Sequence, residues 1–199
     1  LGAFGLEPLA WGASGRAFYY IPAREGGPDG VCRPWVRSIV RADLADWTLT
    51  TLEQAAGSPD GTRIVYSRAT AGGYYKVWFA AADGSGARQL TTGAGQDFKP
   101  SMSAAGRIVF QRILNGQSDL CVIDDPAAAN VIVRNLSATG EVDEYDPVFA
   151  SDEERVFFVQ GRLEGEGRIS SVMADGSGGA VLISAAGHYS DLALSHNGQ

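Results

Sequence analysis

Histidine and cysteine, the side chains on which most metal sites depend, are scarce in this sequence. Of its 199 residues only His188 and His196 are histidines, and only Cys32 and Cys121 are cysteines. The cysteines form no Cys-x-x-Cys pair and have no histidine at zinc-ligand spacing, which argues against a zinc motif. Two free thiols are the favoured interpretation, and one disulfide is the alternative. We expect neither a metal nor a cofactor.

Motifs for nucleophilic catalysis and for phosphate binding are also missing. No Gly-x-Ser-x-Gly elbow occurs, and a Ser-His-Asp triad would have to use one of the two histidines near the end of the chain. The glycine-rich stretches match neither a P-loop nor a twelve-residue calcium loop. We therefore expect that this segment is not itself an enzyme.

Positive charge and long apolar runs are lacking as well. The formal net charge is -7 and the pI is about 4.8, which disfavours nucleic acid as a partner. No stretch approaches the ~20 apolar residues that cross a bilayer. Residues 1–6 lack the charged start and full apolar run of a signal peptide. A hydrophobic content of 45% is nevertheless enough for a sizeable core.

An internal repeat is what the sequence does contain. Tight-turn sequences recur at intervals of 46, 45, 47 and 45 residues, with their turn positions at Gly15, Gly61, Gly106, Glu153 and Gly198. A basic residue follows each of the first four turns within two positions. A run of aromatic or β-branched residues comes next, as is typical of a strand that leaves a turn. The first half of each unit is therefore expected to be a β-hairpin.

The second half of each unit predicts another hairpin. Asp83-Gly84 and Asp175-Gly176 are strong hairpin signals, because glycine accepts the positive φ of such turns. No convincing amphipathic helix is present. Four strands in about 45 residues are typical of a propeller blade. We predict an all-β fold, a β-propeller of four-stranded antiparallel blades with about four complete blades and one further inner strand.

The repeat resembles that of TolB-like propellers, a family with WD40-like repeats. Ser58-Pro59-Asp60-Gly61, Asp83-Gly84 and Leu90-Thr91 match it best, whereas Ala104-Ala105 and Glu153 depart from its turn residues. The resemblance implies that Pro8, Pro100 and Pro147 begin the innermost strands. It also implies a non-catalytic binding scaffold for a protein or small ligand at the channel mouth, located in the periplasm or secreted. We interpret Asp60 as a turn residue whose side chain bonds nearby backbone.

Two enzyme-associated functions are the alternatives. Similar propellers gate the active site of prolyl-oligopeptidase-type serine peptidases, and others occur in polysaccharide lyases. The peptidase function requires an α/β-hydrolase domain outside this segment. The lyase function requires metal-binding histidines that face the channel, and two histidines are few for that purpose.

One single propeller domain is expected over residues 1–199. Its repeats span roughly 8–53, 54–97, 98–143 and 144–188, and a partial repeat spans 189–199. A lone inner strand would leave an unpaired edge. Either the protein continues beyond Gln199, which we favour, or the strand around 191–194 closes a four-bladed ring.

Acidic residues cluster at the expected start of the fourth repeat, where no basic residue lies between Arg134 and Arg155. Such a cluster is relieved by solvent, a cation or a basic partner, and a solvated loop face is the plainest interpretation. Residues 152–154 would lie on the opposite rim. The candidate ligand- or partner-binding residues on the first rim are Asp97, Lys99, Asp143, Glu144, Asp146, His188 and Asp191.

Overall fold

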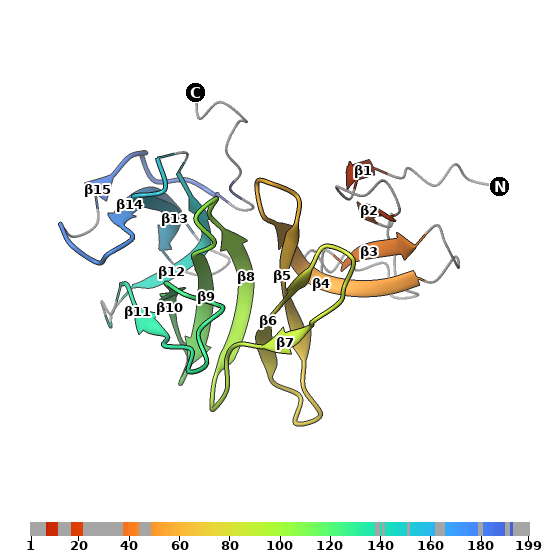
Figure 1. The fold of residues 1–199 in the computed structure, drawn as a ribbon. Helices are drawn as coiled ribbons and strands as arrows, with labels where there is room; N and C mark the ends of the chain where they lie inside the picture. The colour runs from red at the N-terminus through yellow and green to blue at the C-terminus, as the bar shows by residue number, and fades with distance from the viewer. Residues whose placement is uncertain are drawn as a thin grey trace, which may run out of the picture.

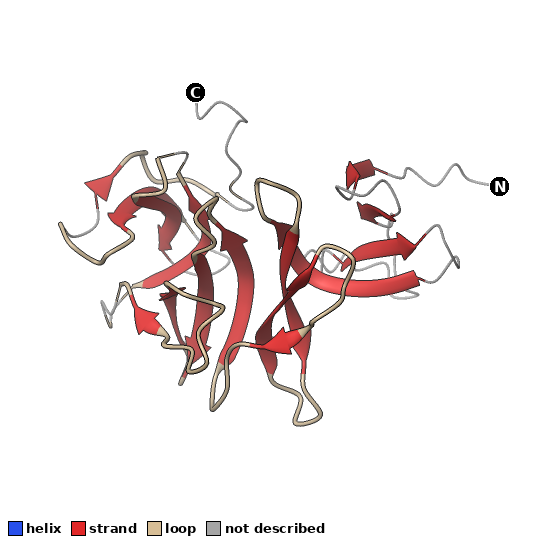
Figure 2. Ribbon diagram, in the orientation of Figure 1, coloured by secondary structure: helices blue, strands red, loops and turns tan. Residues whose placement is uncertain are grey.

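The computed structural model consists of β-strands joined by turns and loops (Figure 2). It describes the strands at residues 7–11, 17–21 and 38–43, and then residues 49–137, 140, 142–150, 152–161, 166–178, 181–189 and 192. Within these ranges every regular element is a strand, so the all-β prediction is confirmed. No helix that could cross a membrane occurs in the same ranges.

In the part of the chain that the structure describes, fifteen strands form three antiparallel sheets, one of seven strands and two of four (Figure 1). The strands of the first sheet are β1 (Glu7–Trp11), β2 (Ala17–Ile21), β3 (Ser38–Asp43), β4 (Leu49–Gly57), β5 (Arg63–Ala69), β6 (Tyr75–Ala81) and β7 (Arg88–Gln89). Those of the second are β8 (Gln96–Met102), β9 (Ile108–Leu114), β10 (Gln117–Ile123) and β11 (Arg134–Asn135). Those of the third are β12 (Asp143–Phe149), β13 (Arg155–Gly161), β14 (Gly167–Met173) and β15 (Val181–Leu182).

Each four-stranded sheet is a meander that matches one predicted repeat. Strands pair in chain order, and the tight turns lie where the repeat places them. Gly61, Gly106 and Glu153 each donate their backbone N–H to the carbonyl three residues earlier, and all three have positive φ. Glu153 therefore takes a left-handed conformation that glycine adopts at lower cost. The departure from glycine in the fourth repeat has left the turn itself unchanged.

The first two expected blades differ from the prediction because they are joined in one sheet. β4 pairs with β3 through its first half and with β5 through its second half. One strand thus closes the first unit and opens the second. No glycine or proline separates Leu49 from Ala56, whereas Gly93 and Gly95 break the chain before β8. Four-stranded antiparallel units are confirmed for the second and third sheets.

Hydrophobic cores lie between consecutive sheets rather than in one central mass. The sheet of β8–β11 lies between those of β4–β7 and β12–β15 (Figure 1). One core joins Val65, Val77 and Leu90 to Met102, Ile108, Phe110, Cys121 and Ile123. The next joins Val109, Leu120, Val122 and Leu136 to Phe149, Val156, Phe158, Val172 and Ala174. Alternate residues of the middle sheet therefore face opposite neighbours, as the period of a strand requires.

An arginine on the last strand of each of the first two sheets forms hydrogen bonds with the sheet that follows. Arg88 on β7 donates to the carbonyls of Pro126 and Ala128, in the loop after β10. Arg134, 46 residues later on β11, donates to the carbonyls of Ala174 and Asp175, in the loop after β14. These carbonyls lie beyond the strand ladders, so the guanidinium groups donate to acceptors that the sheets leave unused.

Candidate binding site at the central strands

Three strands, β4, β8 and β12, lie next to one another where the sheets meet, and we call them the central strands. Each carries a bulge, at which the register with its partner strand shifts. A residue with positive φ occupies each bulge, namely Gln54 (φ 46°), Lys99 (φ 48°) and Asp146 (φ 56°). Such a conformation is uncommon outside glycine and is found where structure around it imposes it.

The bulges also correct the expected place of the prolines. Pro100 and Pro147 do not begin their strands, which start four residues earlier, at Gln96 and Asp143. Each proline instead follows the bulge residue. A proline has no N–H for the ladder, so within a strand it is tolerated at a bulge. Pro8 likewise lies within β1, next to a register shift.

The three bulge residues contact one another across the sheets. The backbone N–H of Lys99 donates to Oε1 of Gln54 at 2.8 Å. The Lys99 ammonium forms an ion pair with the Asp146 carboxylate. We call Gln54, Lys99 and Asp146 the bulge ladder. The Asp146 side chain is 3% exposed, whereas 22% of the Lys99 side chain reaches solvent. The ladder thus presents a cation at its surface and buries the anion.

Asp97 is held in a separate charged network. Its two carboxylate oxygens accept from Nε and Nη2 of Arg112 at 2.7 and 2.9 Å. The Lys76 ammonium lies 3.7 Å from the same carboxylate and donates to the carbonyl of Gly95 at 2.7 Å. Asp97 is 0% exposed. The hydrogen bond to this carboxylate raises the pKa of Arg112 above its usual value. This bidentate geometry fixes β9 against β8.

The remaining candidates take different positions. Oδ1 of Asp143 accepts the backbone N–H of Ser118 at 3.0 Å, which joins β12 to β10. Glu144 is 0% exposed, and its backbone carbonyl accepts from the Ser118 hydroxyl. His188 is exposed, next to the bridge between Gly167 and Gly187. Asp191 lies outside the described residues.

The structure therefore brings Lys99 and Asp146 together. Asp97 instead binds Arg112, and Asp143 binds the backbone of Ser118. Burial of Glu144 and Asp146 shows that the interpretation of the acidic cluster as a solvated loop face is wrong for these two residues. They belong to β12, whose inner edge packs against the neighbouring sheet. Residues 152–154 lie at the other end of β12, as predicted.

Sequence reasoning missed Gln54 and Arg112. Gln54 stands four residues before Ser58, which opens a turn, as Lys99 stands four residues before Ser103. Asp146 stands four residues before Ala150, the corresponding position of the next turn. This common spacing of four residues before the turn could have identified Gln54 from the sequence. Arg112 had no comparable sign, because its pairing with Asp97 depends on the strand register.

Cys121 is a free thiol that is 2% exposed, and burial raises its pKa to about 12. A thiol protonated at neutral pH is a poor nucleophile. Within the described ranges, no group of three or more His, Cys, Asp and Glu side chains is placed to hold a metal ion.

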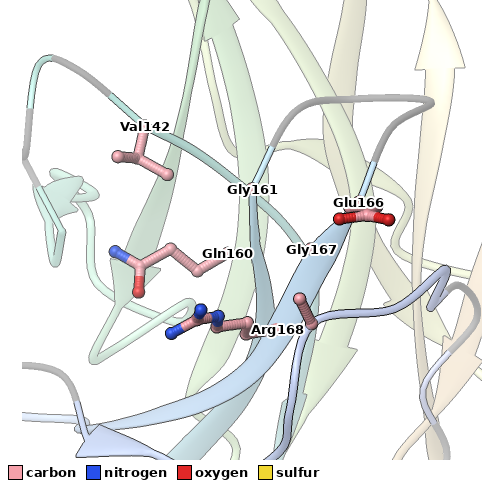
Figure 3. Close-up of a pocket in the computed structure, with 7 residues that line it drawn as sticks. Val142, Gln160, Gly161, Glu166, Gly167 and Arg168 are labelled. Carbon is pink, nitrogen blue, oxygen red and sulfur yellow. The ribbon is translucent and has the colours of Figure 1, made fainter.

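A shallow cavity of about 390 Å³ lies beside the start of β12. Its lining comes from the adjoining ends of β13 and β14 and from the loops next to them, and Figure 3 shows these residues. They are Val142, Gln160, Gly161, Glu166, Gly167, Arg168 and Ala186. A Cβ on Gly161 would lie 2.5 Å from the Cα of Gly167, so the strands approach closely at the cavity edge.

The sheets, stacked in chain order around three central strands, define a β-propeller fold. This fold is structurally similar to the propeller domains of TolB proteins. A TolB structure from Agrobacterium tumefaciens matches with a TM-score of 0.62 and 20% identity, over 92% of this chain and 62% of the other. TolB from Acinetobacter baumannii matches with a TM-score of 0.65 and 15% identity, over 98% of this chain and 47% of the other.

A peptidase shares the same fold. A puromycin-hydrolyzing peptidase from Mycobacterium tuberculosis matches with a TM-score of 0.55 and 15% identity, over 86% of this chain and 30% of the other. No protein-family model matches the sequence, and no curated protein matches it. The chain spans 62% or less of these three structures. At such identities the likeness shows the fold, which is shared by proteins of different function.

Proposed function

We propose that the chain is a non-catalytic β-propeller scaffold that binds a protein partner or small ligand at the mouth of its channel. The bulge ladder carries this proposal. In this proposal the joined first sheet would supply two of four complete blades, and the central strands would line the channel. By analogy with TolB-like propellers, we expect the scaffold to work in the periplasm or outside the cell.

Lys99 is the group that we assign to partner contact. Its side chain is 22% exposed, while the Asp146 side chain that neutralises it is buried. A partner that supplies a carboxylate or carbonyl to Lys99 would meet an ammonium held by Asp146, on a residue whose backbone N–H is bound by Gln54. Holding a side chain in position before binding lowers the entropic cost of association.

Replacement of Lys99 by glutamine tests the assignment. We expect the variant to remain folded and to lose most of its partner capture from a lysate of the source cells. Arg68 provides the matched control, because it is exposed and lies over the Trp78 ring rather than in the ladder. Captured proteins would be quantified by mass spectrometry for wild type, Lys99→Gln and Arg68→Gln. Equal capture by the wild type and the Lys99 variant would remove Lys99 from the binding site.

A second function is favoured by the match to the Mycobacterium tuberculosis peptidase. In this alternative the chain is the propeller part of a serine peptidase and gates access to a catalytic domain. The complete reading frame distinguishes the two functions. An adjoining α/β-hydrolase domain with a Gly-x-Ser-x-Gly elbow supports the peptidase, and its absence supports the scaffold.

A further inference from the structure

We propose that the cavity beside β12 is a second binding site, which takes a carboxylate group through Arg168. This site is separate from the bulge ladder and does not depend on it. Equivalent positions on the first three strands of the second and third sheets carry different charges.

In the second sheet the arginine is paired with a carboxylate of the protein itself. Reading across β8, β9 and β10, the paired residues are Asp97, Arg112 and Asp119. Arg112 lies between two carboxylates, and it binds the first of them through two hydrogen bonds. This arginine therefore has its acceptors within the protein.

In the third sheet the arginine lies on the third strand, whereas Arg112 lies on the second strand of its sheet. Reading across β12, β13 and β14, the paired residues are Glu144, Gln160 and Arg168. Gln160 occupies the position of Arg112, and Arg168 occupies the position of Asp119. The Arg168 guanidinium has no hydrogen-bond or ion-pair partner among the residues that the structure describes. A guanidinium has five donors and no acceptor, so its partner must supply acceptor atoms.

The lining of the cavity favours a carboxylate on a short aliphatic stem. Figure 3 shows the Gln160 carboxamide and the Arg168 guanidinium projecting side by side, with Val142 facing them and Glu166 apart from them. Oε1 of Gln160 already accepts from the Ser170 hydroxyl, which leaves its NH₂ group as a donor. The exposed side chains of Val142 and Ala186 form an apolar part of the cavity wall. A carboxylate matches the guanidinium fork, while a phosphate dianion would be repelled more strongly by Glu166.

Paired probes test the carboxylate requirement. N-acetylglutamate and its neutral isostere N-acetylglutamine represent an acidic side chain. N-acetyl-Ala-Ala as free acid and as amide represents a peptide terminus. Each is titrated into the isotopically labelled protein while the amide signals of Gly161 and Gly167 are followed by NMR. We expect saturable shifts with at least one acid and none with its neutral counterpart, and the acid that binds identifies the source of the carboxylate.

Arg168→Gln is the decisive variant, with Arg68→Gln as the matched control on another sheet. Arg168 is exposed, so its replacement should leave the fold intact, which the thermal unfolding curve verifies. We expect affinity for the acid to fall at least about tenfold in Arg168→Gln and to stay unchanged in the control. Unchanged affinity in Arg168→Gln would overturn the proposal, as would equal binding of acid and amide or no saturable shift with either acid. Lys99→Gln should bind these probes normally, so failure of the ladder and failure of this site are distinguishable.

Discussion

At the scale of single residues, Asp60 shows how the repeat encodes a turn. Its carboxylate accepts the backbone N–H of Thr62 at 3.0 Å and also accepts from the Thr62 and Ser58 hydroxyls. These hydrogen bonds lower the pKa of Asp60 from 3.8 to about 2, with Ser58 contributing most. The interpretation of Asp60 as a turn residue is confirmed. Oδ1 of Asp83 and of Asp175 accepts the backbone N–H two residues later in the same way.

The lowered pKa of Asp60 predicts a pH-dependent contribution to stability. Because the folded-state pKa lies below the unfolded value, the contribution is present above about pH 4 and is lost as the pH falls toward 2. Asp60→Asn should lower the Tm slightly at pH 7, by a few degrees at most because the group is exposed. The difference from wild type should shrink to a small fraction of its pH 7 value as the pH falls to 2. Calorimetry across this range checks it, with the exposed Glu154→Gln as control. A difference that persists undiminished at pH 2 contradicts the assignment.

Burial decides the roles of the acidic residues, and burial was not readable from the sequence. Asp97, Glu144 and Asp146 occur in short polar stretches that have the composition of loops. Each is instead placed in a central strand with its side chain inside the protein. The cations that face Asp97 and Asp146 are 15 and 47 residues away. The pattern of charges along the sequence indicated the acidic cluster, but it did not indicate which cations pair with Asp97 and Asp146.

At the scale of elements, Arg107, the basic residue after the turn of the second sheet, joins that sheet to the third. Arg107 donates to the backbone carbonyl of Glu153, and its guanidinium lies 5.4 Å from the centre of the Phe149 ring. The Glu153 carboxylate accepts the backbone N–H of Ala105 in return, at 2.9 Å. Arg107, which the sequence indicated only as part of a strand pattern, therefore has a packing role.

Removal of the Arg107 guanidinium should weaken the contact between the second and third sheets. We expect Arg107→Gln to lower the free energy of unfolding by about 1–2 kcal/mol, the range for a hydrogen bond from a charged donor together with lost stacking. Urea unfolding measures it. Arg155 is the equivalent residue of the third sheet, and its exposed side chain forms no hydrogen bond, ion pair or ring contact with a described residue. Arg155→Gln should change stability by less than about 0.5 kcal/mol. Equal losses in both variants would contradict the packing role.

Elements were predictable wherever local sequence determines them. The hairpins at residues 61, 84, 106 and 176 follow from turn residues, and the strands between them follow from β-branched and aromatic runs. The sharing of β4 between two units was not predictable in this way. It depends on pairing with strands on both sides, and the run from Leu49 to Ala56 has the length and composition for either partner.

At the scale of the whole molecule, each sheet covers an apolar face of the one before it. Leu90, Leu136 and Ile183 are equivalent, since each donates its N–H to the corresponding carbonyl of the third strand in its unit. Leu90 is 6% exposed and Leu136 is 8% exposed, because the following sheet packs over them. Ile183 lies on the third sheet and is 53% exposed.

This difference predicts unequal effects of the same substitution. Leu136→Ala should cost about 2–5 kcal/mol of unfolding free energy, because it opens a cavity between two sheets. Ile183→Ala should cost less than about 1 kcal/mol in a chain of residues 1–199. Chemical denaturation of the two variants in parallel provides the comparison. A large loss for Ile183→Ala in this chain would show that its side chain is covered.

The most direct test of the account is whether Lys99 and Asp146 act as a pair. They are 47 residues apart in the sequence and meet only if the central strands of consecutive sheets lie together. A double-mutant cycle with Lys99→Met and Asp146→Asn measures their coupling by urea unfolding. The bulge ladder predicts a coupling energy of about 1 kcal/mol or more, because one partner is buried. Additive effects of the two substitutions would contradict both the ladder and the arrangement of the sheets that produces it.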